Sequence, residues 1–74
     1  MELHRVSSSS INSIGYNSLT LTVGVKFING DLYEYYQVPE FVYNMFNNAS
    51  SKGSYLAKHI KDKFKYRKVL VFTS

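Results

Sequence analysis

Residues 19–36 read LTLTVGVKFINGDLYEYY, and this stretch decides the fold class. From Leu19 to Phe27 apolar side chains alternate with polar or small ones, and this period of two is typical of a strand with one buried face. Asn29-Gly30 follows as a hairpin-turn signal, and the residues after it are rich in strand-forming tyrosine. The stretch therefore predicts a β-hairpin.

The register of this hairpin follows from which side chains would be buried. A two-residue loop pairs odd with even positions and would place Glu34 beside Val25 on the buried face. A three-residue loop pairs odd with odd positions, so that Tyr33 and Tyr35 join Val25 and Glu34 shares the solvent face with Lys26. Because a shift of one residue moves every side chain to the other face, we predict the three-residue loop.

The segments around the hairpin predict one more strand before it and two helices after it. Residues 11–16 are expected to form the first strand, and Val38-Pro39-Glu40 opens a helix with Pro39 at its first position. The buried face of that helix is predicted to consist of Val38, Val42, Met45, Phe46 and Ala49.

The second predicted helix runs roughly from Lys52 to Phe64, with Ser50 or Ser51 as its cap. Its apolar side chains fall on one arc of about 100°. They are Leu56, Ala57, Ile60 and Phe64. Residues 68–72 read as a short final strand or an ordered tail.

The predicted fold class is therefore α+β, a three- or four-stranded antiparallel meander sheet with two helices packed on one face. The order is β-β-β-α-α, with or without a final strand. We expect one domain over residues 1–74, with a core at about 6–69 and residues 70–74 as a short tail or edge strand.

The composition leaves little room for catalysis or metal binding. The chain has no cysteine, and its two histidines, His4 and His59, are too few for a zinc site. Neither a nucleophilic triad, nor converging carboxylates, nor a glycine-rich phosphate loop is visible. We expect no enzyme activity, cofactor or metal, and, without a membrane-length apolar run or a secretion signal, a cytoplasmic location.

The positive charge is concentrated in one segment. The net charge is +4, but residues 52–68 hold seven cations and one anion. Lysines on a solvated helix face can neutralise phosphates, and flanking tyrosines can stack on unpaired bases. The candidate nucleic-acid-binding residues are Lys52, Tyr55, Lys58, Lys61, Lys65, Tyr66, Arg67 and Lys68. The same lysines are also what an ordinary surface helix displays.

The tyrosine-rich strand has two interpretations. Exposed strand tyrosines can serve as stacking platforms for RNA bases. The predicted register instead turns Tyr33 and Tyr35 toward the helices as core residues, and leaves Tyr36 as the exposed ring.

Two functions follow as hypotheses. The first is a non-catalytic module that binds RNA or single-stranded nucleic acid. The second is a protein-interaction module, or a phage or bacterial accessory protein with no nucleic-acid ligand, whose apolar residues 69–72 pair with the sheet edge of a partner.

Several short motifs, in order, resemble the KTSC domain family. They are Val6-Ser7-Ser8, Ile14-Gly15-Tyr16, Asn29-Gly30, Tyr33-Glu34-Tyr35, Val38-Pro39, residues 49–55, and Ile60 with Tyr66-Arg67. The family is named for its place at the C-terminus of some lysyl-tRNA synthetases and also occurs as small separate proteins. The resemblance covers residues 6–69 and implies a complete domain with RNA binding as a suggested role and no catalytic residues.

Overall fold

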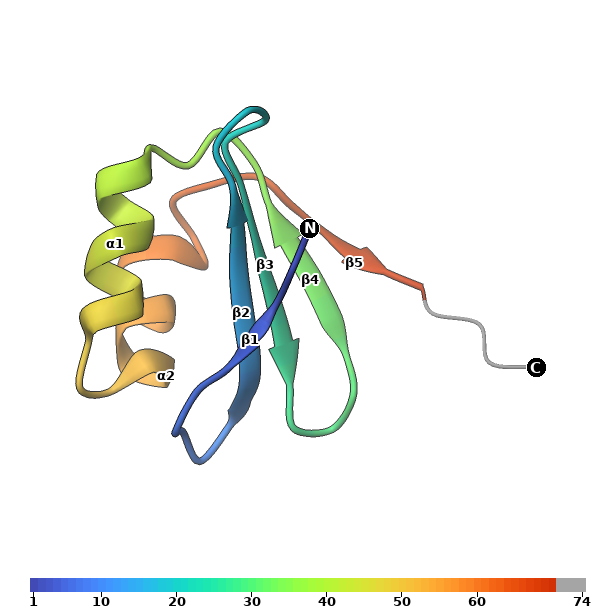
Figure 1. Cartoon of the computed structure of the whole chain (residues 1–74), viewed down its shortest axis with the longest axis vertical. Coiled ribbons are helices and arrows are strands. Elements are labelled where there is room, and N and C mark those ends of the chain that lie inside the picture. The colour runs from blue at the N-terminus through green and yellow to red at the C-terminus, as the bar shows by residue number, and fades with distance from the viewer. Residues whose placement is uncertain (71–74) are drawn as a thin grey trace.

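A single antiparallel sheet organises the computed structural model, which describes residues 1–70 (Figure 1). Its strands pair in sequence order. They are β1 (His4–Arg5), β2 (Ile11–Asn17), β3 (Thr22–Phe27), β4 (Leu32–Tyr35) and β5 (Tyr66–Val69). Helix α1 (Glu40–Asn48) is followed by α2 (Lys52–Tyr55), which continues into a π-helical turn, η1 (Leu56–Ile60). Figure 1 shows the helices gathered on one side of the sheet.

The predicted α+β class is confirmed, and the sheet has five strands rather than three or four. The short β1 was not predicted. The final strand was predicted two residues too late, because β5 starts at Tyr66 and pairs with β4. Leu70 is exposed beyond the end of β5, and the rest of the predicted tail, 71–74, lies outside the described residues.

The three-residue hairpin loop is confirmed. Val23 pairs with Tyr35 and Val25 with Tyr33, so odd positions face odd positions. The Phe27 amide donates to the Asp31 carbonyl at 2.8 Å, which closes a loop over residues 28–30. Gly30 adopts φ 97°, the left-handed conformation that this loop type needs at its third position.

The first part of the predicted hairpin strand is a turn. Leu19 is 93% exposed, and the strand begins only at Thr22. The Asn17 side-chain oxygen accepts a hydrogen bond from the Leu19 amide at 3.0 Å, an interaction that competes with strand pairing. Leu21 then takes a positive φ of 55°. The alternation of residues 19–21 was therefore misleading, because local polar contacts outweighed the pattern.

The N-terminal segment, residues 1–3, covers the face of the sheet that the helices leave free. Gly15 and Gly24 face each other across β2 and β3, and both are buried. A Cβ on Gly15 would collide with the Glu2 carbonyl oxygen and the Leu3 side chain, so the backbone of this segment lies directly on the sheet. In Figure 1 the segment passes across the strands. The residues of β3 from Thr22 to Val25 are consequently all buried.

Helix α1 is turned differently from the prediction. Val38 and Phe46 are buried as expected, but Met45 is 57% exposed and Tyr43 takes its place in the core. The cause lies in β2, where the Tyr16 ring stacks on Tyr43 with 4.9 Å between centroids. The Tyr16 hydroxyl also donates to the Val38 carbonyl at 2.6 Å. The helix starts at Glu40, with Pro39 just outside it rather than at its first position.

The second helix ends earlier than predicted. The Lys61 amide donates to the Leu56 carbonyl at 2.8 Å, a five-residue step that widens the last turn. Residues 61–64 form a turn instead of more helix. Leu56 and Ile60 are buried as predicted, whereas Ala57 is exposed. Ser51 sits at the cap position but makes no capping side-chain hydrogen bond.

We expect Gly15→Ala to destabilise the domain more than Gly24→Ala. The added methyl group at Gly15 meets backbone, whereas at Gly24 it meets the flexible side chains of Met1 and Leu3. Overpacking of this kind costs about 1–3 kcal/mol. Urea unfolding followed by circular dichroism measures both free energies. Equal losses at the two positions would show that the N-terminal segment does not hold the sheet as described.

We also expect stability to fall as the pH rises above 10. Burial raises the pKa of Tyr16, Tyr35, Tyr36 and Tyr43 above the ordinary value of 10.0, with the nearby acids Glu40, Asp62 and Glu34 adding to the effect at the first three. The unfolded chain therefore loses these protons first, so the stability present below pH 10 is lost as pH rises through the folded-state pKa values. Urea midpoints at pH 8 and above pH 10 test this, and equal midpoints would contradict it.

Candidate functional site

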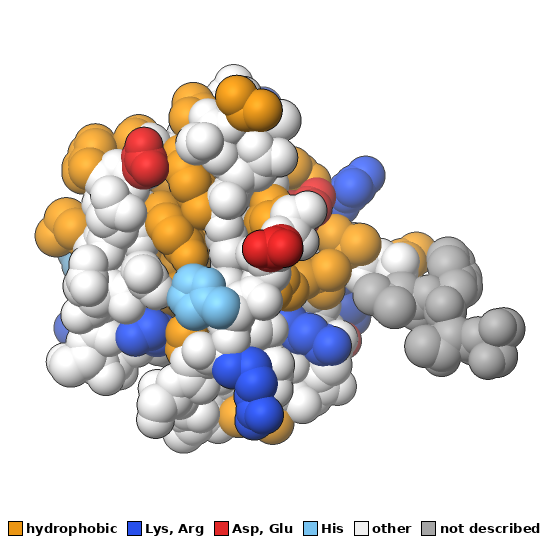
Figure 2. Space-filling model, in the orientation of Figure 1, with side chains coloured by type: hydrophobic (Ala, Val, Ile, Leu, Met, Phe, Trp, Pro, Cys, Tyr) orange, Lys and Arg blue, Asp and Glu red, His pale blue; other side chains and the backbone are white. Residues whose placement is uncertain are grey.

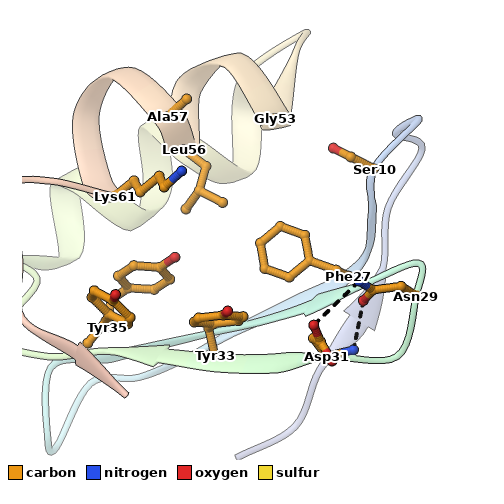
Figure 3. Close-up of a pocket in the computed structure, with 11 residues that line it drawn as sticks. Ser10, Phe27, Asn29, Asp31, Tyr33, Tyr35, Gly53, Leu56, Ala57 and Lys61 are labelled. Carbon is orange, nitrogen blue, oxygen red and sulfur yellow. Dashed lines mark hydrogen bonds between the residues drawn. The ribbon is translucent and has the colours of Figure 1, made fainter. Parts of the chain in front are cut away.

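A cleft of about 410 Å³ opens between the second helix and the part of the sheet formed by β3, β4 and β5 (Figure 3). Its floor is aromatic and is built from Phe27, Tyr33, Tyr35 and Tyr66. These four residues lie together because the odd-to-odd register turns Phe27, Tyr33 and Tyr35 to the helix side, and Tyr66 pairs with Tyr35 across β5.

The rings of the floor support one another. The centroids of Tyr33 and Tyr66 are 5.8 Å apart, as are those of Tyr35 and Tyr66, and Phe27 meets Tyr33 edge-on at 5.5 Å. Tyr35 is only 3% exposed, whereas Tyr66 is 57% exposed. Burial, together with the neighbouring Tyr33 and Tyr66, raises the pKa of Tyr35, so this hydroxyl stays neutral well beyond physiological pH. The floor is thus an uncharged aromatic surface that opens toward solvent at Tyr66.

The wall of the cleft comes from one side of the second helix. Gly53, Leu56, Ala57 and Lys61 line it, at the spacing that places residues on one helical face. In Figure 3 Leu56 points down toward the tyrosines, and the Lys61 side chain extends along the helix side above them. Ala57 is small and exposed, so this wall leaves the cleft open.

Charge is divided along the cleft. Lys61 is the only basic residue in its lining, and Asp31 is the only acidic one, at the hairpin end. Oδ2 of Asp31 lies 3.5 Å from the Lys68 ammonium, and it accepts a hydrogen bond from the side-chain amide of Asn29 at 3.4 Å. The Asn29 side-chain oxygen in turn accepts a hydrogen bond from the backbone amide of Asp31 at 2.9 Å (Figure 3). These contacts hold the carboxylate at the mouth of the cleft.

Two of the candidate basic residues are matched by acids. Arg67 lies 3.6 Å from Glu34 across β4 and β5, and Lys68 pairs with Asp31. Tyr36, predicted to be an exposed ring, is half-buried and donates from its hydroxyl to Glu34 at 2.9 Å. Surface ion pairs of this kind contribute little to stability, but they reduce the charge that β5 presents to a ligand.

The remaining lysines of the segment are less engaged. Lys58, Lys61 and Lys65 are exposed and have no acidic partner within residues 1–70. Lys52 donates to the Ala49 carbonyl at 3.0 Å, which ties it to the end of α1. On the face seen in Figure 2, hydrophobic side chains follow the seam beside α1, and the basic ones are scattered rather than gathered in one field.

The two candidate stacking tyrosines differ in availability. Tyr55 packs between Phe46, at 5.9 Å between ring centroids, and His59, at 4.6 Å, so it belongs to the edge of the core. Tyr66 has an open face and lines the cleft. Sequence reasoning missed Phe27 and Asp31 as cleft residues, and it left Tyr33 open between a stacking platform and a core residue. Their shared parity with Tyr35 was visible, but nothing local showed that the helices would leave these rings partly uncovered.

The described residues contain no group of three metal-ligating side chains. No helix among residues 1–70 is long and apolar enough to cross a membrane. A second concavity, beside the first turn of α2, is lined by the serines of residues 7–10 and 50–54 together with Lys52 and Gly53. The aromatic cleft combines four aromatic rings with one acid and one lysine in its lining.

Comparison with known proteins places this geometry in a family. The chain is 42% identical over 67 residues to a lysine–tRNA ligase of Trichormus variabilis and 39% identical to one of Nostoc sp., and in each case the match covers 90% of the chain but 12% of the ligase. A crystal structure of a KTSC domain protein from Yersinia pestis matches with a TM-score of 0.87 and 39% identity, over 92% of this chain and 96% of that one. The model of the KTSC domain matches residues 7–64, so the chain belongs to the KTSC domain family.

Proposed function

We propose that this domain is a non-catalytic module that binds RNA or another single-stranded nucleic acid. The observation that carries the proposal is the group of exposed lysines, Lys58, Lys61 and Lys65, which have no acidic partner in the described chain. Two of them, Lys61 and Lys65, line a hollow together with the open ring of Tyr66. Unpaired ammonium groups attract phosphates and release counterions from them, and an exposed aromatic ring stacks on bases of any sequence.

The ion pairs on β5 limit which residues can make strong phosphate contacts. Because Arg67 and Lys68 already face Glu34 and Asp31, the strongest phosphate contacts belong to the helix and the turn after it. Lys52, Arg67 and Lys68 contribute weaker contacts, because each already has a partner within the domain. Tyr55 is left out, because its ring is packed against Phe46 and His59. Three to five phosphate contacts give a slope of about −2 to −3.5 for log affinity against log salt on single strands.

The relatives support RNA as the ligand. The proteins that contain the matching segment are named as lysine–tRNA ligases, and the segment makes up 12% of each. Because a tRNA ligase acts on RNA, we propose contact with RNA, rather than chemistry on it, as the role of the present chain.

We expect Lys58→Gln/Lys65→Gln to weaken binding of a labelled single-stranded RNA and to lower the salt slope by about 1.4, because two phosphate contacts are lost. Arg5→Gln/Lys26→Gln removes the same charge from exposed positions on β1 and β3 and is the matched control. Fluorescence anisotropy at several salt concentrations measures both effects. Binding that ignores salt, or that the two variants weaken equally, would contradict the proposed interface.

The outer edge of β5 favours one alternative function, that of a protein-interaction module. This strand ends the sheet, and within residues 1–70 its second edge has no partner strand, so another protein could add a strand there. Arg67 and Lys68 on this strand counteract such pairing, since charged side chains protect sheet edges. A discrete protein partner that survives nuclease treatment, together with absence of RNA binding, would favour the alternative.

A further inference from the structure

We propose that the aromatic cleft holds one unpaired nucleobase, with its face on the tyrosine floor and its amino-bearing edge toward Asp31. The inference rests on the proposed function and specifies how that function is carried out. It adds a base-reading site to the phosphate contacts made by the lysines.

The shape of the cleft suits a single flat ring. At about 410 Å³ it lies in the range of small-molecule sites, which span roughly 300–1,000 Å³. Tyr33 and Tyr66 offer partly exposed rings whose positions are already set by Tyr35 and Phe27. A base that enters therefore stacks on a surface that needs no reordering, and Leu56 and Ala57 cover it from the helix side.

The charges orient the strand. A phosphate is repelled by the Asp31 carboxylate and attracted by Lys61, which lies on the helix side of the cleft. Lys65 lines an adjoining hollow together with Lys61 and Tyr66, where three lysines outnumber the one acid, Asp62. The sugar-phosphate backbone is therefore placed along Lys61 and Lys65, and the neutral base lies across the tyrosine floor with its edge toward Asp31.

Asp31 gives the site a preference among bases. Its Oδ2 is engaged by Lys68 and Asn29, whereas Oδ1 has no hydrogen-bond partner within the described residues. A carboxylate oxygen accepts hydrogen bonds and cannot donate them. Adenine and cytosine present an exocyclic amino group to such an acceptor, while uracil presents a carbonyl oxygen at the same position. The cleft should therefore favour adenine or cytosine over uracil.

The test uses RNA octamers of adenine, cytosine or uracil and the full-length protein. Ala57→Trp fills the cleft from an exposed position, and Ser54→Trp adds the same bulk to the same helix outside the cleft. We expect Ala57→Trp to weaken adenine binding by about 5- to 150-fold, the contribution of one stacked base, with the salt slope unchanged. Ser54→Trp should bind as the wild type does. Upfield shifts of the base protons in NMR spectra report stacking directly.

Two further variants separate stacking from base reading. Tyr66→Ala should weaken binding of all three octamers, and Tyr66→Phe, which keeps the ring, should not. Asp31→Ala should abolish the preference for adenine over uracil without weakening uracil binding, because it removes the acceptor and releases Lys68.

The outcomes distinguish failure of the inference from failure of the function. If no octamer binds the wild type at low salt, the proposed function is wrong and the inference falls with it. If the octamers bind with the expected salt slope but Ala57→Trp and Tyr66→Ala leave affinity and base-proton shifts unchanged, the lysines bind RNA and the cleft is not the base site. Equal binding of adenine and uracil by the wild type would overturn the role of Asp31.

Discussion

The pairing of β3 with β4 is the constraint on which the rest of this structure depends. A loop of three residues, 28–30, sets odd positions opposite odd ones, and this register sends Phe27, Tyr33 and Tyr35 to the helix side. A shift of one residue would put Glu34 among the core side chains and the tyrosines in solvent. The core and the cleft floor thus share one origin, since both are made by the same face of the same hairpin.

The helices then divide that face into a closed part and an open part. Helix α1 is held against β2 by the stacking of Tyr16 on Tyr43 and by the hydrogen bond from Tyr16 to Val38. The second helix ends in the wide turn Leu56–Ile60, and the chain then returns to the sheet as β5. Because Ala57 is small, the rings of Tyr33 and Tyr66 remain accessible beside it. A complete cover would have given a larger core and no cleft.

Electrostatics complete the arrangement. The basic segment is not a uniform patch, because its last two members are drawn to the acids of β4 and the hairpin loop. Arg67 and Lys68 are thus held by acids at the edge of the sheet, whereas Lys58, Lys61 and Lys65 have no acidic partner within residues 1–70. This pairing also leaves an acid at the hairpin end of the cleft and Lys61 on its helix side, and that separation of charge suits a neutral base joined to an anionic backbone.

Much of the fold could be predicted from the sequence by itself. Alternation, the Asn29-Gly30 turn and the avoidance of a buried Glu34 determined the hairpin and its register, the ordered motifs determined the family, and composition determined the excess of lysine. These are local or summed properties, so no coordinates are needed to obtain them. The strand start at Thr22 was missed because Asn17 competes through its side chain, and the burial of Tyr43 was missed because its partner Tyr16 lies 27 positions away.

The candidate site was only partly predictable. The lysines and Tyr66 were visible as residue types, but three facts came only from the tertiary structure: the N-terminal segment on the second face of the sheet, the packing of Tyr55, and the ion pairs of Arg67 and Lys68. Each depends on a partner brought close by folding rather than by sequence. Which aromatic rings stay open is decided by how far the helices extend over the sheet. Which cations stay free is decided by the acids that strand pairing brings beside them, and side-chain periodicity encodes neither.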